Sequence, residues 1–326
     1  MAHTLRNQES RSSLNDSRRG KQLANSLTVW CQWDDLEIPE NTRLTNSPLA
    51  SMNASQRDEI QIYVPQYMGG RPVLTHIQEL KNLEIVQLLM AGFEDALEFM
   101  SEGITLCNAT GVHNDSTAEL TVALTLSSLR GIPDFVRNQE IGVWDHKRNP
   151  SLSDKTVGII GYGSIGKSLD HLLANFPVNI RRFARTAREG VHALHELNTY
   201  LPQLDVIILL IPLNSDTEKL FDATRLKLMK DGALLVNVAR GGIVDTDALV
   251  QELQSGRISA ALDVTDPEPL PLDHPLWKLK NCLISPHVGG DSGAFEKRGR
   301  RLVEEQLQRL SNGVNLVNVI DWISLK

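Results

Sequence analysis

A glycine-rich turn between a strand and a helix places the tightest constraint on this chain. Residues 161–166 read Gly-Tyr-Gly-Ser-Ile-Gly, with the apolar run 156–160 before them and a helical pattern after them. In such a turn Gly161 permits the sharp reversal, Gly163 lets a pyrophosphate approach the backbone, and Gly166 lets helix and strand pack closely. The unpaired N–H groups at the helix N-terminus bind the phosphates. The turn therefore predicts a dinucleotide-binding site in an α/β sheet.

The end of the next predicted strand indicates which dinucleotide binds. Residues 178–184 form this strand, which ends about 20 residues beyond the glycines, where an NAD site carries Asp or Glu for the ribose hydroxyls. Ala184 occupies that position here, and Arg185 and Arg188 follow it. A carboxylate would repel a 2′-phosphate, whereas guanidinium groups pair with one. We therefore expect NADP to be favoured, with NAD possible, and Arg185 and Arg188 to be cofactor ligands; the alternative is that they are ordinary surface arginines.

Composition and charge exclude several classes of protein. The 326 residues are 41% hydrophobic, as in an ordinary soluble globular protein, and the net charge is −7 with the basic residues scattered, which argues against nucleic acid as a partner. No apolar stretch approaches the ~20 residues of a membrane span. The three cysteines, Cys31, Cys107 and Cys282, are far apart and lie in or beside apolar runs. We interpret them as buried thiols of a protein in the reducing cytoplasm.

The first 25 residues differ from the rest of the chain. They hold five basic and two acidic residues among many Ser, Asn and Gln, which favours a disordered tail. The alternative is a transit peptide, which would be amphipathic. Leu5, Leu14 and Leu23 are nine residues apart and alternate between opposite faces of a helix, so no apolar stripe forms. We therefore exclude residues 1–25 from the fold.

Short apolar strands alternate with helical patterns after this tail. The first part of the chain has predicted strands at residues 27–31, 60–64, 83–89 and 104–107. Helices are predicted at residues 75–80, 93–99 and 117–129. The polar stretch 41–58 predicts a long surface loop, and 131–150 an irregular segment. This alternation is typical of a small α/β domain.

The second part of the chain has the six strands of a doubly wound sheet. They are predicted at residues 156–160, 178–184, 206–211, 233–238, 259–262 and 282–284. A helix at 294–310 and an apolar run at 314–319 follow without a second dinucleotide fingerprint, so we expect the chain to return to the first domain. The predicted fold is α/β, with a doubly wound parallel (Rossmann) sheet inserted in a smaller, flavodoxin-like α/β domain. The expected domains are residues 121–292 for the dinucleotide and residues 26–120 with 293–326 for the substrate.

Three polar residues follow the last three strands of this sheet, at the edge where such folds bind ligands. They are Arg240, Glu268 and His287. Reduction of a keto acid needs a cation for the substrate carboxylate, an acid for the developing alkoxide, and a partner that keeps this acid charged. Arg240, His287 and Glu268 have these capacities in that order, because a neighbouring carboxylate stabilises imidazolium. Singly, they could be a surface charge, a loop histidine and a turn acid; together they predict hydride transfer to a keto acid.

The segments around these residues resemble the signatures of the D-isomer-specific 2-hydroxyacid dehydrogenases. The similarity runs from about Leu27 to the end and is carried by residues 161–166, 236–245, 261–270 and 285–290. It implies Arg240 for substrate binding, His287 as acid/base and Glu268 as its partner. It also implies a set of cofactor contacts: Ser164 and Ile165 at the pyrophosphate, Val238 and Asp263 near the nicotinamide carboxamide, and Gly290.

A second segment of the resemblance concerns the substrate. Residues 88–92, Leu-Leu-Met-Ala-Gly, resemble the family loop whose backbone N–H groups hold the substrate carboxylate, which assigns Met90, Ala91 and Gly92 to substrate binding. The alternative is a plain turn at a strand end, where small residues are common. The resemblance further implies that the segment from Thr117 to Pro150, which contains Trp144, forms a homodimer interface.

The implied activity is hydride transfer between NAD(P)H and a small 2-keto or 2-hydroxy acid, as in glyoxylate or hydroxypyruvate reductases. Ala184 and Thr265 depart from the family pattern and leave the cofactor and the pocket shape open, while Glu268 disfavours the formate dehydrogenase branch. A phosphoglycerate dehydrogenase-like enzyme remains an alternative, disfavoured because no regulatory extension follows the catalytic body. A dinucleotide-sensing corepressor or scaffold on the same fold is the other; the complete trio favours an enzyme.

One pair of histidines resembles part of a metal site. His192 and His195 are three residues apart, but a third ligand is not evident. We expect them on an exposed helix face, and no metal.

Overall fold

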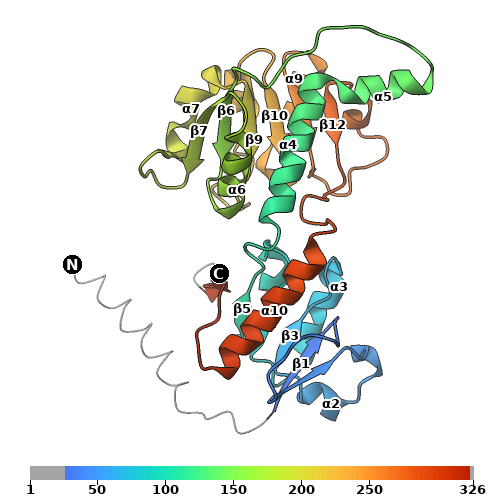
Figure 1. Cartoon of the computed structure of the whole chain (residues 1–326), viewed down its shortest axis with the longest axis vertical. Coiled ribbons are helices and arrows are strands. Elements are labelled where there is room, and N and C mark those ends of the chain that lie inside the picture. The colour runs from blue at the N-terminus through green and yellow to red at the C-terminus, as the bar shows by residue number, and fades with distance from the viewer. Residues whose placement is uncertain (1–25, 324–326) are drawn as a thin grey trace. The chain divides into compact units, whose positions relative to one another are not determined.

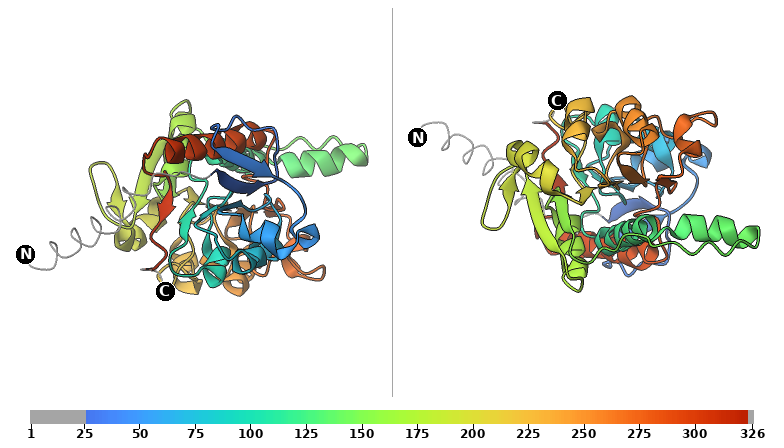
Figure 2. Two further views of the ribbon diagram at one scale, coloured as in Figure 1. Left: turned by 90° about the horizontal axis from the view of Figure 1, so that it is seen from below. Right: turned by 90° about the horizontal axis from the view of Figure 1, so that it is seen from above.

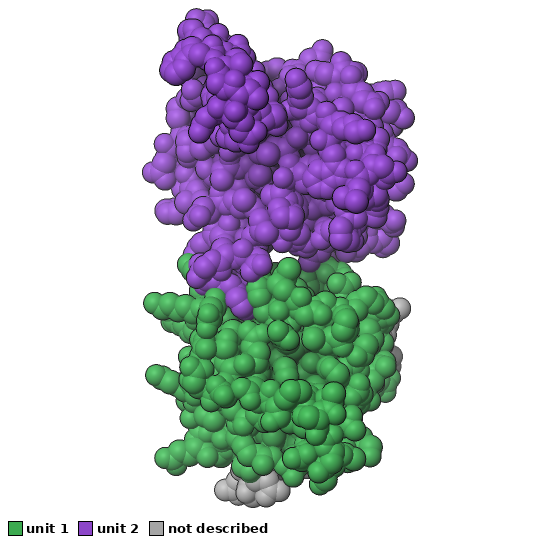
Figure 3. Space-filling view, turned by 90° about the vertical axis from the view of Figure 1, so that its right-hand side faces the viewer, with its two compact units in different colours: residues 1–109, 296–326 green, residues 110–295 purple. Residues whose placement is uncertain are grey.

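The glycine turn joins a strand to a helix as expected. In the computed structural model, which describes residues 26–323, β6 (Thr156–Ile160) leads through the turn into α6 (Ser164–Leu173) (Figure 1). The predicted N-terminal tail lies outside the described residues. The chain folds as two compact units, shown in two colours in Figure 3: unit 1 holds residues up to 109 and from 296 onward, and unit 2 holds residues 110–295.

Unit 2 is built on a parallel sheet with the order β12-β11-β10-β9-β6-β7-β8. The strands besides β6 are β7 (Asn179–Ala184), β8 (His192–Ala193), β9 (Val206–Leu209), β10 (Leu234–Asn237), β11 (Ser259–Leu262) and β12 (Cys282–Ile284). The chain runs outward from β6 in both directions, which is the doubly wound order of a Rossmann sheet. The sheet has seven strands where six were expected, because the two-residue β8 pairs with β7 at the edge.

Both faces of this sheet are covered, which explains why its central strands β6, β9 and β10 are mainly apolar. Along β9, Ile207 packs into the core on one face and Ile208 into the core on the other, as the period of two in a strand requires. The second of these cores includes apolar residues of α6 and of α4 (Asn114–Arg130). The first includes residues of α8 (Ala223–Leu228) and α9 (Thr246–Gln254).

Helix α4 corrects the expected domain boundary at residue 120. The whole helix lies in unit 2, because its apolar residues pack on α6 and the sheet rather than on unit 1. It ends at Gly131, whose φ of 67° is the left-handed conformation that terminates helices. The segment after it, predicted as irregular, contains α5 (Ile132–Glu140), which Figure 2 shows projecting from the rest of unit 2.

Short elements complete unit 2. They are the 3₁₀ turns η4 (Leu194–Glu196), η5 (Leu201–Gln203), η6 (Gly241–Ile243) and η7 (Pro275–Lys278), and the helix α7 (Leu197–Tyr200). None of the helices within residues 26–323 is long and apolar enough to cross a membrane.

Unit 1 has the strand order β13-β5-β4-β3-β1-β2. Its strands are β1 (Leu27–Cys31), β2 (Thr42–Thr45), β3 (Ile62–Val64), β4 (Ile85–Gln87), β5 (Thr105–Cys107) and β13 (Val319–Ile320). Its helices are η1 (Leu49–Ser51), α2 (Ala54–Asp58), α3 (Gly70–Leu74), η2 (Thr75–Glu79), η3 (Glu94–Phe99) and α10 (Phe295–Ser311). The five parallel strands follow the flavodoxin-like order. The prediction of a surface loop at residues 41–58 was wrong, because this stretch contains β2, η1 and α2.

The chain returns to unit 1 after the Rossmann sheet, which confirms the predicted insertion. Strand β13 pairs antiparallel with β5, and Trp322 Nε1 donates to the Ile104 carbonyl (3.1 Å). Gln306 of α10 is buried and donates from Nε2 to Gln87 Oε1 (2.7 Å) and to the Val317 carbonyl (2.9 Å). Buried amides are satisfied in this way only when both segments are in place, so the C-terminal segment is an integral part of unit 1.

Candidate active site

The glycine turn has the shape that a dinucleotide requires. A Cβ at Gly161, whose φ is 109°, would lie 2.5 Å from the Leu210 backbone, and one at Gly166 would lie 2.6 Å from the Gly161 carbonyl oxygen. Both positions therefore require glycine. The space beside Gly163 is open to 4 Å, and Gly163 caps α6, so the N–H groups at the start of this helix, including those of Ser164 and Ile165, lie beside open space. These residues fit a pyrophosphate.

The loop after β7 carries the residues expected to choose the cofactor. Ala184 is the last residue of β7, and Arg185 and Arg188 follow it with exposed side chains. Arg188 is folded back toward the glycine turn, because its Nη2 donates to the Tyr162 carbonyl (2.7 Å). The position that usually carries an acid thus lacks one, and a guanidinium group is held beside the turn.

Three loops at the carboxyl edge of the sheet bring the predicted catalytic residues into one region of unit 2. Strands β10, β11 and β12 are neighbours, and the loops after them carry Arg240, Glu268 and His287. The first two loops touch closely: a Cβ at Gly241 would lie 1.9 Å from the Thr265 carbonyl oxygen. Only glycine at 241 allows this approach, so Arg240 is tied to the loop of Glu268. The Arg240 Nη1 donates to the Ala239 carbonyl (2.7 Å).

His287 and Glu268 form the contact that the sequence predicted. The His287 Nδ1 lies 2.5 Å from the Glu268 Oε1, and the side chains are 42% and 41% exposed, so both remain accessible. This contact uses Nδ1 and leaves Nε2 of the ring for another group. His287 has a φ of 54°, an uncommon value for a residue with a side chain and one that the surroundings must hold in place.

Asp263 is the group that holds the histidine loop. Its buried carboxylate accepts hydrogen bonds from Ser285 Oγ (2.6 Å), the Val288 N–H (3.0 Å) and the Gly289 N–H (2.8 Å). Its backbone carbonyl accepts from the His287 N–H (2.7 Å). The family resemblance implied a position for Asp263 near the nicotinamide. It did not predict the role of Asp263 in holding the loop, because the four contacts are with residues more than twenty positions away and leave no local pattern in the sequence.

The other predicted cofactor residues of unit 2 lie at the same edge. Val238 directly follows β10 and is almost fully buried. Gly290 lies beyond His287, and its carbonyl accepts a hydrogen bond from the His113 Nδ1 (3.0 Å). A Cβ at Gly290 would lie 3.1 Å from this nitrogen, so the small residue lets the loop lie against His113.

The predicted substrate loop lies in unit 1, at the carboxyl end of β4. Its carbonyl groups are occupied: that of Met90 accepts from the Ala109 N–H (2.9 Å), and that of Ala91 accepts from the Asn108 Nδ2 (2.7 Å). Because these carbonyls are held on the Asn108 side, the loop from Met90 to Gly92 has a defined backbone conformation. Asn108 is a residue that the sequence reading missed.

The histidine pair does not form the predicted helix face. His192 lies in β8, and its ring packs on Tyr200 with the centroids 4.4 Å apart, while His195 lies in the 3₁₀ turn η4. His192 lies in this short edge strand because its backbone pairs with that of Phe183 in β7. No cluster of three metal-binding side chains occurs among the residues described.

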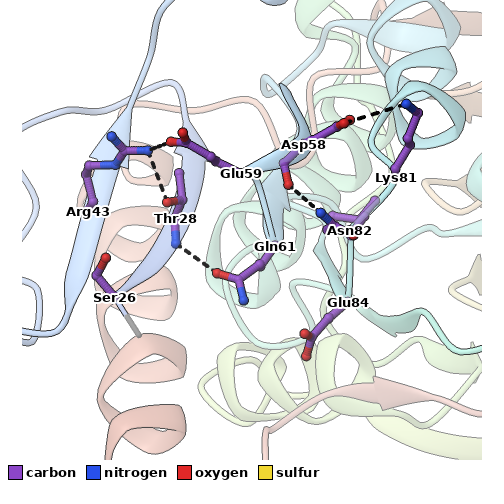
Figure 4. A pocket seen from close by; sticks show the side chains of 10 residues that line it. Ser26, Thr28, Arg43, Asp58, Glu59, Gln61, Lys81, Asn82 and Glu84 are labelled. Atoms are coloured by element: carbon purple, nitrogen blue, oxygen red, sulfur yellow. Dashed lines mark hydrogen bonds and ion pairs between the residues drawn. The ribbon is translucent and has the colours of Figure 1, made fainter. Parts of the chain in front are cut away.

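A cavity of about 710 Å³ lies in unit 1, at the edge of its sheet opposite the edge that carries the predicted substrate loop (Figure 4). It is lined by Ser26, Thr28, Arg43, Asp58, Glu59, Gln61, Lys81, Asn82, Leu83 and Glu84. Thr28 is in β1, and Gln61 and Glu84 directly precede β3 and β4, so the lining belongs to the amino ends of the strands. Its charges pair with one another, Arg43 with Glu59 and Lys81 with Asp58. None of the predicted site residues lies there.

Comparison with known proteins identifies the family and supports the fold. The model of the D-isomer specific 2-hydroxyacid dehydrogenase NAD-binding domain matches residues 122–289. The chain is 36% identical over 234 residues to a glyoxylate reductase of Thermofilum pendens, covering 67% of this chain and 68% of the relative. It is 33% identical to a D-3-phosphoglycerate dehydrogenase of Methanocaldococcus jannaschii over 75% of this chain, and it spans about half (49%) of that relative.

A solved structure extends the similarity to most of the chain. It is an NADPH-dependent glyoxylate/hydroxypyruvate reductase from Sinorhizobium meliloti, in complex with NADP and malonate. The TM-score is 0.73 at 25% identity, and the match covers 91% of this chain and 98% of that one. Together with the glycine turn and the loops that carry Arg240, Glu268 and His287, these matches show that the chain belongs to the D-isomer specific 2-hydroxyacid dehydrogenase family.

Proposed function

We propose that this protein reduces a small 2-keto acid to a D-2-hydroxy acid, or catalyses the reverse reaction, with NADP as its preferred cofactor. The observation that carries the proposal is the 2.5 Å contact between His287 Nδ1 and Glu268 Oε1. Glu268 lies on the loop that touches the loop of Arg240. A bound nicotinamide dinucleotide supplies or accepts the hydride. The relatives named as glyoxylate and hydroxypyruvate reductases support a substrate of two or three carbons.

The roles of the three residues follow from their chemistry. Arg240 binds the substrate carboxylate and polarises the neighbouring carbonyl with its fixed positive charge. His287 gives the Nε2 proton to the developing alkoxide, or removes it in the oxidation direction. Glu268 faces Nδ1 and orients the ring. In unit 1, considered by itself, Met90, Ala91 and Gly92 offer backbone N–H groups suited to a carboxylate.

An assay of the purified chain tests this function directly. NADPH or NADH is mixed with a panel of acids that includes glyoxylate, hydroxypyruvate and 3-phosphohydroxypyruvate, and the nicotinamide absorbance is followed. Turnover of the phosphorylated acid alone would favour the phosphoglycerate dehydrogenase alternative. Cofactor binding without turnover of any acid would favour a dinucleotide-sensing corepressor or scaffold and would contradict the proposed enzyme.

We expect wild-type protein to use NADPH at least about tenfold better than NADH. Ala184 offers no carboxylate to repel a 2′-phosphate, and one charge-assisted contact to the phosphate contributes about 1.5–3 kcal/mol, which is roughly a tenfold effect or more. The variant Ala184→Asp/Arg188→Ala adds a ribose acceptor and removes a phosphate donor, so it is expected to prefer NADH. The measurement is kcat/KM for both cofactors at fixed substrate and ionic strength.

A matched variant separates a specific acceptor from a general change of charge. Ala187→Asp/Arg188→Ala carries the same charges, but its new acid lies three residues beyond the end of β7. It is expected to lose NADPH affinity without gaining NADH activity. Equal or better use of NADH by the wild-type protein would overturn the cofactor assignment and leave the catalytic residues untouched.

We also propose that the projecting segment that contains α5, Ile141 and Trp144 forms a homodimer interface. Ile141 and Trp144 are 72% and 95% exposed, and Phe135 and Val136 lie in the same projecting segment. Apolar side chains gathered on a projection of this kind mark a protein interface. Light scattering is expected to give twice the 36.2 kDa of the chain, and Ile141→Glu/Trp144→Glu is expected to give the monomer mass. Leu272→Glu, at a residue that is 97% exposed elsewhere in unit 2, serves as the control and is expected to remain a dimer.

A further inference from the structure

Tyr162, the second residue of the glycine turn, is in contact with two arginines. The guanidinium carbons of Arg182 and Arg188 each lie 5.7 Å from the centroid of its ring. Its hydroxyl donates to Asp170 Oδ2 (2.6 Å), and Arg182 donates to the same carboxylate from Nε (3.1 Å) and Nη2 (2.8 Å). The ring is therefore fixed by one residue of α6 and one of β7.

The Tyr162 hydroxyl is the donor in its bond to Asp170. Burial raises the pKa of Tyr162, and the hydrogen bond to Asp170 raises it further, so the hydroxyl keeps its proton and remains a donor. The pair with Asp170 also raises the pKa of Arg182. The charge of Arg182 is paired with Asp170 through two hydrogen bonds, whereas Arg188 donates to a backbone carbonyl, so we take Arg188 as the arginine of this cluster that binds a ligand.

Arg188 is held in place although its side chain is exposed. Its backbone N–H and carbonyl pair with Val191 in a short antiparallel bridge (3.0 and 2.9 Å). Its Nη2 donates to the Tyr162 carbonyl (2.7 Å), while the guanidinium lies over the Tyr162 ring. A guanidinium group has further N–H donors beyond the one used here. Tyr162 thus contacts Arg188 through both its backbone and its ring.

We propose that Tyr162 is a specificity-determining positioning residue, which holds the Arg188 guanidinium beside the glycine turn for the 2′-phosphate of NADP. The inference rests on the NADP preference proposed above. A long, exposed arginine loses side-chain freedom when it binds a phosphate, and a ring that orders it beforehand reduces that loss. Tyr162 acts through Arg188 alone, so its contribution is confined to the phosphorylated dinucleotide.

The test measures binding rather than turnover, with the full chain and isothermal titration calorimetry. The probes are NADPH and NADH, with adenosine 2′,5′-bisphosphate and adenosine 5′-phosphate as fragments that differ only in the 2′-phosphate. Tyr162→Ala is expected to bind NADPH and the bisphosphate roughly three- to tenfold more weakly, with the other two ligands changed less than about twofold. Tyr162→Phe keeps the ring and is expected to retain most of the preference. Tyr162→Ile replaces the alanine variant if that variant does not fold.

A double-mutant cycle shows whether Tyr162 acts through Arg188. On an Arg188→Ala background, Tyr162→Ala is expected to weaken NADPH binding by less than about twofold. Fully additive effects, or equal loss of NADPH and NADH in Tyr162→Ala, would overturn the role of Tyr162. A wild-type protein that binds the bisphosphate no better than adenosine 5′-phosphate would instead overturn the NADP preference, and this inference with it.

Discussion

His287→Asn is expected to lower kcat by roughly 10²–10⁴-fold while leaving the dissociation constant of the cofactor nearly unchanged. In the proposed mechanism, the substitution removes the proton that the Nε2 of His287 supplies to the alkoxide. The loop itself is held by other groups, since the buried carboxylate of Asp263 accepts hydrogen bonds from two N–H groups that follow His287. Steady-state kinetics with the best acid of the panel, together with cofactor titration, measures both quantities.

Two variants separate proton transfer from positioning. Glu268→Gln keeps a side chain opposite His287 Nδ1 but removes the charge, so it is expected to reduce kcat less than His287→Asn. Asp263→Asn is expected to act differently, because it disturbs the loop and weakens cofactor binding as well. Near-native turnover by His287→Asn would show that another group is the acid.

Arg240→Ala is expected to lower kcat/KM by about 10³-fold or more, through a higher KM and a lower kcat together. A charge-assisted contact to the substrate carboxylate contributes to binding, and a donor aimed at the developing oxyanion contributes about 10²–10³-fold to turnover. Arg240→Lys keeps the charge without the two-pronged geometry and is expected to fall between the wild-type protein and Arg240→Ala. Initial rates over a range of acid concentration separate the two parameters.

The matched control is Arg181→Ala, which removes an exposed arginine from β7 in the same unit. It is expected to leave both parameters unchanged. Loss of kcat alone in Arg240→Ala would mean that another cation binds the carboxylate. Loss of affinity for the cofactor, measured in the absence of acid, would mean that Arg240 supports the dinucleotide site instead.

Several errors of the sequence reading share one cause, which is that edge strands lack a hydrophobic signature. Strand β2 has the sequence Thr-Arg-Leu-Thr and no buried side chain, so its composition predicts a surface loop. Strand β8 has only two residues, and the spacing of His192 and His195 predicted a helix there instead. An edge strand covers little of the core, and its pairing partner, rather than its own composition, decides that it forms.

Other features were outside the reach of any local pattern. The buried amides of Gln87 and Gln306 are 219 positions apart, and their hydrogen bond is visible only once the chain has returned to unit 1. Asp263 also has distant partners, because the side-chain contacts that it makes with the histidine loop are with residues 22 to 26 positions away. In each case a polar side chain finds its partner across the fold, because a buried polar group must be satisfied wherever a donor or acceptor is available.

The sequence by itself determined the elements whose physical requirements are local. A sharp turn beside a phosphate needs glycine, and strands covered on both faces need continuous apolar runs, so the glycine turn, the central strands and the loops with Arg240, Glu268 and His287 could be placed from residue types and spacing. The tertiary structure decided what depends on distant partners: the hydrogen bonds of Asp263 that hold the His287 loop, the close approach of Gly241 to Thr265, and the ring of Tyr162 beneath Arg188. These depend on side-chain geometry across the fold, which residue spacing does not encode.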